Sequence, residues 1–508
     1  MKTTFIKTIV LNLAVLFFCC SCTESTDDVI GMGENIPDMI PPISALTVER
    51  PDNSEQVTLN WKNPVNPYLS SVEITYYKTA EEDQKITILL DAVSGQTVTH
   101  NVTIEDPSSY MFTLVAINKA GVRSEAKSIS YETLTGKAKW LDRANTLMTS
   151  MVNLYLNNKP LDIWSSQYPQ GDGYWDGAAV IWGHGAAFSG YATLKHAAES
   201  DAELKTFIET NYDSRLLTGI DKFRNTRDGG PEAYAVYPGE GDERFYDDNI
   251  WVGIDMVDLY ELTGDSKYLN RARLVWDFVL SGSDQAMGGG VYWKEGQKTK
   301  NTCSTAPAAV LGAKLYKATN EQQYLDKAID YYDWVKTNLQ DPEDHLYWDH
   351  AYFTDENDPN SDIQIAKQKY SYNSGQPIQA AALLYEITNE QKYLQDAQIV
   401  AEAAHARWFT PFKSYILNEN FNILEPGHVW FQAITLRGFA ELYEIDGNSK
   451  YIDDFKKTLD HAWLSDARNP NTNLVNENFK GTTTQNSWEV IHQGAIVEML
   501  SRLAMLSE

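Results

Sequence analysis

Two adjacent carboxylates, Asp247 and Asp248, stand between aromatic residues where an apolar, helix-like run begins. Their segment reads Tyr246-Asp247-Asp248-Asn249-Ile250-Trp251 and leads into residues 252–262. Hydrolysis of a glycosidic bond with retention uses two carboxyl groups about 5–5.5 Å apart, one as acid/base and one as nucleophile. Neighbouring Cα atoms lie about 3.8 Å apart, so side chains that diverge from one turn can span that gap. The alternative is that one aspartate only caps the helix.

Composition restricts the partner that such a site would serve. The chain has 508 residues and a formal net charge of -28, and no basic cluster is visible. Nucleic acids are excluded as partners because phosphate binding requires patches of Lys and Arg. The 14 Trp and 29 Tyr suit stacking on sugar faces, and they would equally suit a large aromatic core. An uncharged polysaccharide therefore fits better than an anionic one.

The first 22 residues have the pattern of an export signal. Lys2 and Lys7 precede a short apolar core, residues 9–18, which is too short for a usual membrane span. The run Cys19-Cys20-Ser21-Cys22 resembles a bacterial lipoprotein signal with Cys22 as the acylated residue and Cys20 as the alternative. The acidic residues that follow resemble the surface-export signal of Bacteroides-type bacteria. We expect a lipid anchor in the outer membrane, facing either the cell surface or the periplasm.

Two segments separate this signal from the helical part of the chain. Residues 23–40 mix Gly and Pro with acidic residues, which is typical of a flexible linker. Residues 41–135 contain alternating runs at 57–61, 72–76 and 110–118, which predict a small all-β sandwich. Trp61 and the 110–121 stretch resemble a fibronectin type III module. Because only Cys303 follows Cys22, no intramolecular disulfide framework is available.

From residue 136 to 508 the apolar period becomes helical. A phrase of the form Leu-Tyr-x-x-Thr/Asp-Gly/Asn, closed by Tyr-Leu or Tyr-Ile, recurs four times, with its first tyrosine at 260, 316, 385 and 443. Each copy predicts a helix end, a turn at Gly or Asn with positive φ, and the start of a new helix. Repeated helix pairs must stack to bury their faces. The uneven steps and long aromatic loops favour a closed toroid with an active-site rim.

Four motifs in register resemble glycoside hydrolase family 76, the endo-α-1,6-mannanases. They are Tyr246–Trp251, Gly288–Trp293, Asn301–Ala309 and Tyr372–Gly375. The resemblance covers residues 136–508 and implies an (α/α)6 barrel. It also implies retaining cleavage of α-1,6-mannan, or of manno-oligosaccharides, with Asp247 as the nucleophile and Asp248 as the acid/base. The acid should then have a raised pKa, because it lies beside a second carboxylate and is partly buried.

Further residues are candidates for substrate binding, each with a structural alternative. The aromatic side chains would stack on mannose rings or belong to the core, and the asparagines would bond sugar hydroxyls or the backbone. They are Tyr246, Trp251, Tyr292, Trp293, Tyr372, Asn301 and Asn373, together with Asp176 from a polar and aromatic loop. The glycines 288–290 would let a ligand approach the backbone or would form a plain loop. His184 is expected to be a core histidine.

No cofactor or metal is expected. The chain has no HExxH pattern, no CxxC pattern outside the signal run at 19–22, no phosphate-binding or dinucleotide loop, and no EF-hand spacing around 355–360. In the late part of the barrel this chain differs from the usual family sequence at Gln432 and Ala433, although it keeps Arg437. It also differs from the family at Ser374. These departures leave open endo or exo action, substrate length and tolerance of branches.

Two other interpretations remain. One is a glycan-binding lipoprotein on an inactive hydrolase fold, which the intact aspartate pair disfavours. The other is a different (α/α)6 sugar enzyme, such as an unsaturated glucuronyl hydrolase or an epimerase, which would need cleft cations or paired histidines. We expect a monomer, with the N-terminal sandwich as a spacer from the membrane.

Overall fold

The structure is a computed structural model of the 508-residue chain. It describes residues 36, 38–51, 54–81, 83–156, 162–170, 177–227, 229–239 and 242–507. The predicted signal at 1–22 with Cys22, residues 23–35 of the predicted linker, and Asp176 lie outside the described residues. Within the described ranges, no helix has the length and apolarity needed to cross a bilayer.

The strands of the N-terminal part form two antiparallel sheets that share one hydrophobic core. Their bounds are β1 (Ser44–Glu49), β2 (Gln56–Lys62), β3 (Leu69–Lys78), β4 (Ile86–Asp91), β5 (Thr97–Thr103), β6 (Ser109–Asn118) and β7 (Lys127–Glu132). One sheet has the order β1-β2-β5 and the other β4-β3-β6-β7. Trp61 of β2, Ile74 of β3 and Phe112 of β6 meet in that core. The three alternating runs of the sequence are therefore strands, because alternation places every second side chain on one face.

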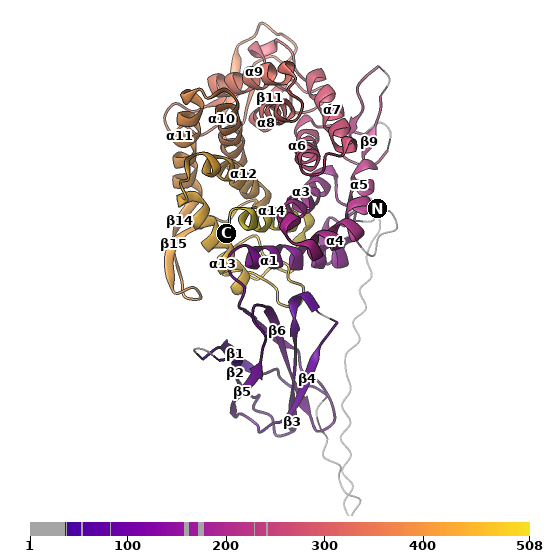
Figure 1. The fold of residues 1–508 in the computed structure, drawn as a ribbon, viewed down its shortest axis with the longest axis vertical. Coiled ribbons are helices and arrows are strands. Elements are labelled where there is room, and N and C mark those ends of the chain that lie inside the picture. Colours follow the sequence, from indigo (N-terminus) through magenta and orange to yellow (C-terminus); the bar gives the residue numbers. More distant parts are fainter. Residues whose placement is uncertain are drawn as a thin grey trace, which may run out of the picture.

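The helices begin with α1 and continue to the C-terminus as a ring (Figure 1). Their bounds are α1 (Gly136–Met151), α3 (Ile181–Ala197), α4 (Ala202–Asn211), α5 (Asp213–Asp221), α6 (Tyr246–Thr263), α7 (Ser266–Ser281), α8 (Thr302–Thr319), α9 (Gln322–Leu339), α10 (Tyr372–Thr388), α11 (Gln391–Trp408), α12 (Val429–Asp446), α13 (Lys450–Leu464) and α14 (Val490–Met505). The inner helices are α3, α6, α8, α10, α12 and α14, and each packs against the next, with α14 returning to α3. The ring is therefore closed.

Inner and outer helices differ in burial. The inner helices, such as α3 and α14, are buried on nearly all sides. The outer helices α7, α9, α11 and α13 bury one stripe against the ring. That difference is expected, since an apolar stripe marks a helix with one solvated face, whereas uniform apolarity marks a buried helix.

The repeated phrase ends the inner helices as its sequence predicts. In each copy the residue after the helix has positive φ, namely Gly264, Asn320, Asn389 and Gly447. Its backbone N–H donates to the carbonyl oxygen of the repeated tyrosine four residues earlier. Glycine and asparagine adopt this left-handed conformation at low cost, so each copy ends its helix at a fixed place.

Short elements join the helices at the two ends of the ring. Their strands are β8 (Gln167–Tyr168) with β16 (Trp488–Glu489), β9 (Arg224–Asn225) with β10 (Ala233–Tyr234), β11 (Thr299–Asn301) with β12 (His350–Phe353) and β13 (Ile363–Ala366), and β14 (Phe409–Ser414) with β15 (Glu419–Leu424). The single-turn elements of the ring are η2 (Val152–Leu156), η3 (Ala198–Ser200) and η4 (Ala286–Gly288), whereas η1 (Thr79–Glu81) follows β3 in the β domain.

The β domain is joined to the ring through buried ion pairs. The Arg143 guanidinium of α1 binds Glu132 of β7 and Asp460 of α13. The ring also reaches β7 through Arg468, which donates to Ser130 Oγ at 2.6 Å.

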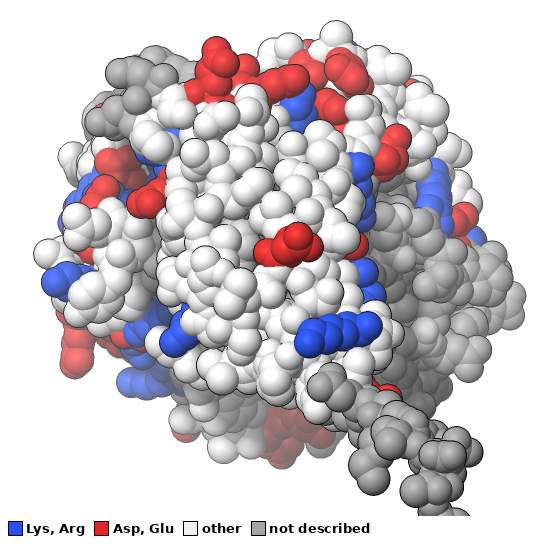
Figure 2. Space-filling view, turned by 90° about the horizontal axis from the view of Figure 1, so that it is seen from below, with Lys and Arg blue, Asp and Glu red and all other residues white. Residues whose placement is uncertain are grey.

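Figure 2 shows the molecule from below. Uncharged residues cover most of the near face, and charged side chains of both signs lie mainly toward its margins.

Helices α10 and α12 cross closely because glycines meet there. A Cβ on Gly438 would lie 2.2 Å from the carbonyl oxygen of Gly375. We expect Gly438→Ala to lower the unfolding free energy by at least about 1–3 kcal/mol, because the helices must separate. Denaturant unfolding measures this loss. Gly185→Ala in α3 is the matched control, since its Cβ would meet nothing nearer than 3.9 Å. An equal loss in both variants would contradict the close crossing.

Candidate active site

The inner helices begin at the same end of the ring, and their first residues form the site. Asp247 and Asp248 lie in the first turn of α6, after the N-cap residue Phe245. Neither aspartate is the cap, so the capping alternative is wrong. Both residues are partly exposed.

Asp247 has an environment that leaves one of its oxygens without a partner. Its Oδ2 accepts a hydrogen bond from Trp293 Nε1 at 3.1 Å. Its Oδ1 is enclosed and makes no hydrogen bond with any described residue. Burial raises the pKa of Asp247 to about 6, while the Cys303 thiol, the Trp293 indole and first-turn backbone N–H groups favour the ionised form. An enclosed carboxylate oxygen without a partner is costly unless a ligand uses it.

Asp248 holds its proton more tightly than Asp247. Burial and the charge of Asp247 raise the pKa of Asp248 well above the usual value of a carboxyl group. The two neighbours therefore titrate as a pair, with Asp247 ionising first. One carboxylate and one carboxylic acid side by side can supply a nucleophile and a proton donor at the same pH.

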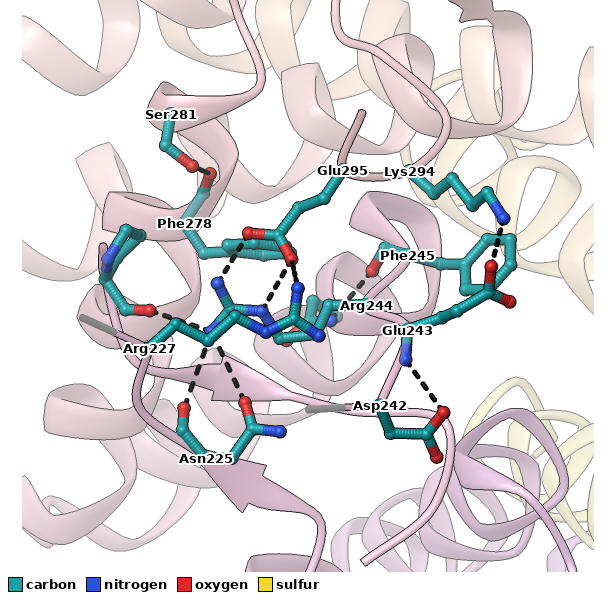
Figure 3. Close-up of polar contacts among 12 residues, drawn as sticks. Asn225, Arg227, Asp242, Glu243, Arg244, Phe245, Phe278, Ser281, Lys294 and Glu295 are labelled. Atoms are coloured by element: carbon teal, nitrogen blue, oxygen red, sulfur yellow. Dashed lines mark hydrogen bonds and ion pairs between the residues drawn. The ribbon is translucent and has the colours of Figure 1, made fainter. Parts of the chain in front are cut away.

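A scaffold of ion pairs fixes the loops around the start of α6 (Figure 3). The buried Arg244 binds Glu295 through two nitrogens, and its guanidinium carbon lies 4.9 Å from the ring centre of Phe278. Arg227 binds the same Glu295 at 2.7 Å. The backbone N–H of Tyr246 donates to the carbonyl oxygen of Trp293 at 2.8 Å. These contacts join residues 224–245 to 291–300 and so set the position of the aspartate pair.

Aromatic residues from opposite sides of the ring meet beneath the pair. Trp251, one turn below Asp247 on α6, lies 5.0 Å from Trp430 of α12, centre to centre. Trp430 in turn contacts Trp182 of α3 at 5.5 Å. Both Trp251 and Trp430 are buried. They form the floor of the site rather than an open stacking surface.

One side of the site is a stack of rings, of which only Tyr372 was a candidate from the sequence. His428 lies parallel to Trp182, with ring centres 5.1 Å apart, and also stacks on Phe431 at 4.4 Å. Tyr372 stacks on Phe431 at 4.1 Å. Burial lowers the pKa of His428 to about 4, so this ring is neutral near pH 7. The wall is aromatic and uncharged, as a neutral sugar requires.

The remaining candidates have different surroundings. Tyr246 is buried against Phe278 of α7, so its core alternative holds. The Tyr292 hydroxyl donates to Asp284 Oδ2 at 2.9 Å. Asn373 Nδ2 donates to Asp349 Oδ1 at 3.4 Å. The core assignment of His184 is confirmed, because the ring is buried and its Nε2 accepts from the backbone N–H of Trp164.

Asn301 and two residues missed by the sequence lie beside these groups. Asn301 is the N-cap residue of α8, and its Oδ1 accepts from Thr299 Oγ1 at 2.9 Å. Cys303 and Asp349 were not among the candidates. Cys303 is near enough to Asp247 and Asp349 that their charges, after burial, raise the pKa of its thiol. Among the described residues, no group of three or more His, Cys, Asp or Glu is arranged to hold a metal ion.

A closed ring of helix pairs with a carboxylate pair and aromatic walls at one end is the architecture of a carbohydrate-active hydrolase. The family model of glycosyl hydrolase family 76 matches residues 139–508, and the chain belongs to this family.

Solved structures support the same assignment. A family 76 glycoside hydrolase from a bovine Bacteroides thetaiotaomicron strain is 38% identical with a TM-score of 0.72, over 92% of this chain and 100% of that one. A family 76 mannosidase from B. thetaiotaomicron is 46% identical with a TM-score of 0.69, over 72% and 98%. An inactive double variant of the α-1,6-mannanase of Salegentibacter sp., in complex with α-1,6-mannotetrose, is 23% identical with a TM-score of 0.57, over 72% and 99%.

Curated relatives match over shorter stretches. A provisionally named mannan endo-1,6-alpha-mannosidase of Schizosaccharomyces pombe is 31% identical over 155 residues, which are 28% of this chain. The match spans 34% of that relative and 39% of a second S. pombe protein, so it covers little more than a third of either.

Proposed function

We propose that this protein hydrolyses α-1,6-mannosidic bonds of mannan, or of manno-oligosaccharides, with retention of anomeric configuration. The observation that carries the proposal is the pair of adjacent aspartates in the first turn of α6, beside the aromatic wall. Burial raises the pKa of both carboxyl groups, and the charge of Asp247 further raises the pKa of Asp248. The Salegentibacter α-1,6-mannanase supports it, because that enzyme was inactivated at two consecutive aspartates and binds α-1,6-mannotetrose.

The mechanism assigns one task to each aspartate. Asp248 gives its proton to the glycosidic oxygen as the bond to the anomeric carbon breaks, while the Asp247 carboxylate attacks that carbon to form a glycosyl ester. Asp248, now ionised, removes a proton from water, and the resulting hydroxide oxygen displaces Asp247. Two inversions at one carbon give net retention. The order of ionisation suits these tasks, since the nucleophile must be charged and the acid protonated at the start.

The surroundings of Asp247 should prepare it for attack. The Trp293 indole N–H donates to Oδ2, so the carboxylate has a fixed orientation. Tyr372 and Phe431, with Trp182 and His428, give the sugar chain an aromatic and neutral wall. We assign substrate contact to this wall and to Trp293, Asn301 and Asn373, and a supporting position to Trp251 and Tyr246.

We further infer the context in which the enzyme works. The signal pattern supports acylation of Cys22 and a tether at 23–40 that links the outer membrane to a fibronectin III-like spacer at 41–135, with the barrel at 136–508. The two sheets around a common core support that spacer. Membrane fractionation with radiolabelled palmitate, compared with Cys22→Ser, tests the anchor.

Product analysis tests the activity. Residues 23–508 are incubated with linear α-1,6-mannan, and the anomeric proton signals of new reducing ends are followed by NMR. We expect manno-oligosaccharides whose first detected anomer is α. A first-formed β anomer would contradict retention, and no products with retained mannan binding would favour a glycan-binding lipoprotein.

The pH profile depends on the hydrogen bond from Trp293. Removing the indole N–H with Trp293→Phe should raise the pKa of Asp247 above its value of about 6, because the ionised form loses a donor. The acid limb of kcat/KM, which reports ionisation of Asp247, should therefore move to higher pH.

Trp348→Phe is the matched control for this shift. Its Nε1 also donates to an aspartate, Asp341 Oδ2, at 3.1 Å, but Asp341 lies outside the proposed site. An acid limb that stays in place in Trp293→Phe, or that moves equally in both variants, would refute the role given to Asp247.

A further inference from the structure

A small sheet extends from the start of α8 and turns one face outward. In this sheet β11 pairs with β12, and Asn301 stands opposite His350 while Thr299 stands opposite Tyr352. Between these pairs, Lys300 and Ala351 are opposite one another and are fully buried. Because successive side chains of a strand point to opposite faces, Thr299, Asn301, His350 and Tyr352 share the other face. This face is buried at Asn301 and is exposed at Tyr352.

That outward face borders a cavity of about 400 Å³. Tyr352, whose side chain is 38% exposed, and His350 supply two rings with centres 5.6 Å apart. Gln297 and Thr299 add an amide and a hydroxyl to the lining. Lys298 and Glu356, of opposite sign, also line it. An aromatic surface edged with hydrogen-bonding groups, whose two charges are of opposite sign, suits a neutral sugar. The volume lies within the usual range of ligand sites, about 300–1,000 Å³.

The outward face is connected rigidly to the aspartate pair. Asn301 is the N-cap residue of α8, two residues before Cys303, whose thiol lies beside Asp247. The backbone N–H of Thr302 donates to the carbonyl oxygen of Asp349 at 2.9 Å, which fixes the start of β12 against α8. Along β11, Thr299 lies about 7 Å beyond Asn301, since a strand rises about 3.4 Å per residue. A chain held at this face would thus lie a short distance from the bond to be cleaved.

We propose that the outward face of β11 and β12, with the cavity beside it, is a distal binding site for the neutral main chain of the polysaccharide. The site stacks a sugar unit on Tyr352 and bonds its hydroxyls through Thr299 and Gln297. It holds long substrates in register with the aspartate pair and leaves short ones unassisted. This inference rests on the proposed mannan hydrolysis.

A ladder of linear α-1,6-manno-oligosaccharides and the linear polymer tests the distal site in Tyr352→Ala. For the polymer we expect kcat/KM to fall about tenfold, through KM, because the stacking area of one ring is lost. For the shortest oligosaccharide that is cleaved, kcat/KM should change by less than about twofold. Tyr352→Trp should restore polymer cleavage. Tyr415→Ala is the control, since Tyr415 is 82% exposed on the β14–β15 turn.

Binding gives a second measurement that does not depend on turnover. In an Asp248→Asn background, affinity electrophoresis in linear mannan should show weaker retention for Tyr352→Ala than for Tyr415→Ala. Equal losses at all chain lengths, or none at any, would overturn the distal site. A loss confined to branched mannan would also overturn it, since the face would then hold a side branch. If the unaltered protein cleaves neither oligosaccharide nor polymer, the proposed function fails, and the distal site fails with it.

Discussion

Asp247→Asn should abolish mannan hydrolysis, with kcat lowered by about 10⁴-fold or more, because an amide cannot form the glycosyl ester. Asp248→Asn should lower kcat by about 10²–10⁴-fold, because the leaving oxygen then departs without a proton. The two variants are distinguished by the leaving group. An aryl mannoside with an acidic phenol needs no proton, so Asp248→Asn should form the glycosyl-enzyme from it in a burst, whereas Asp247→Asn should not. Rapid-quench kinetics and intact mass spectrometry measure that burst.

The stability of these variants provides the control for folding. Both aspartates have folded-state pKa values raised above those of the unfolded chain. Groups of this kind contribute stability that is present below the unfolded pKa and is lost as pH rises through the folded pKa. At pH 7 the unaltered protein therefore bears the cost of buried charge, which an asparagine avoids. Both variants should show a Tm at pH 7 equal to or above that of the unaltered protein. Activity lost together with a lower Tm would indicate misfolding instead of lost chemistry.

Sequence patterns predicted the structure correctly where it is determined by residues that are close together in the chain. The repeated tyrosine phrase predicted the helix ends, because Gly or Asn with positive φ is required within four residues of that tyrosine. The pattern also contained an unused signal. The starts of α6, α8, α10 and α12 each lie 13 or 14 residues before a repeated tyrosine. Counting back from the tyrosines would have placed Cys303, Trp430 and Phe431 in the first turns that surround the site.

The side of a helix on which a residue lies could not be read from proximity in the chain. Tyr246 directly precedes Asp247, but one residue turns about 100° around an α-helix. Its ring accordingly points outward to Phe278 of α7, while the aspartates face the site. Asp349 and His428 come from loops that only ring closure brings beside α6. Their contacts depend on the tertiary arrangement, which no short window of sequence specifies.

Buried charges join three of the inner helices, α6, α12 and α14. Arg437 of α12 binds Glu498 of α14 through two hydrogen bonds of 2.6 and 2.9 Å, and its NH2 lies 3.5 Å from Asp255 Oδ1 of α6. All three side chains are buried. Although burial alone would raise the pKa of Glu498, Arg437 and Arg502 hold it below the usual value. Burial raises the pKa of Asp255 to about 7.

Arg437→Leu should therefore cost about 3–5 kcal/mol of unfolding free energy at pH 7, because buried Asp255 loses its cation and buried Glu498 keeps only its bond to Arg502. Lys450→Leu, which breaks the exposed pair with Glu402, is the control and should cost at most about 1 kcal/mol.

The sign of the pH dependence distinguishes a lost ion pair from a packing defect. Glu498 contributes stability in the unaltered protein above its unfolded pKa, and that contribution is lost as pH falls through its lower folded pKa. In Arg437→Leu the pKa of the same carboxyl should rise, because Arg502 alone remains beside it. The carboxyl should then take up a proton on mild acidification, which removes the cost of its poorly compensated charge. The difference in unfolding free energy should therefore shrink between pH 7 and pH 4.5, as measured by urea unfolding. A difference independent of pH would mean that Arg437 acts through its shape, and the inner helices would then owe their closure to packing alone.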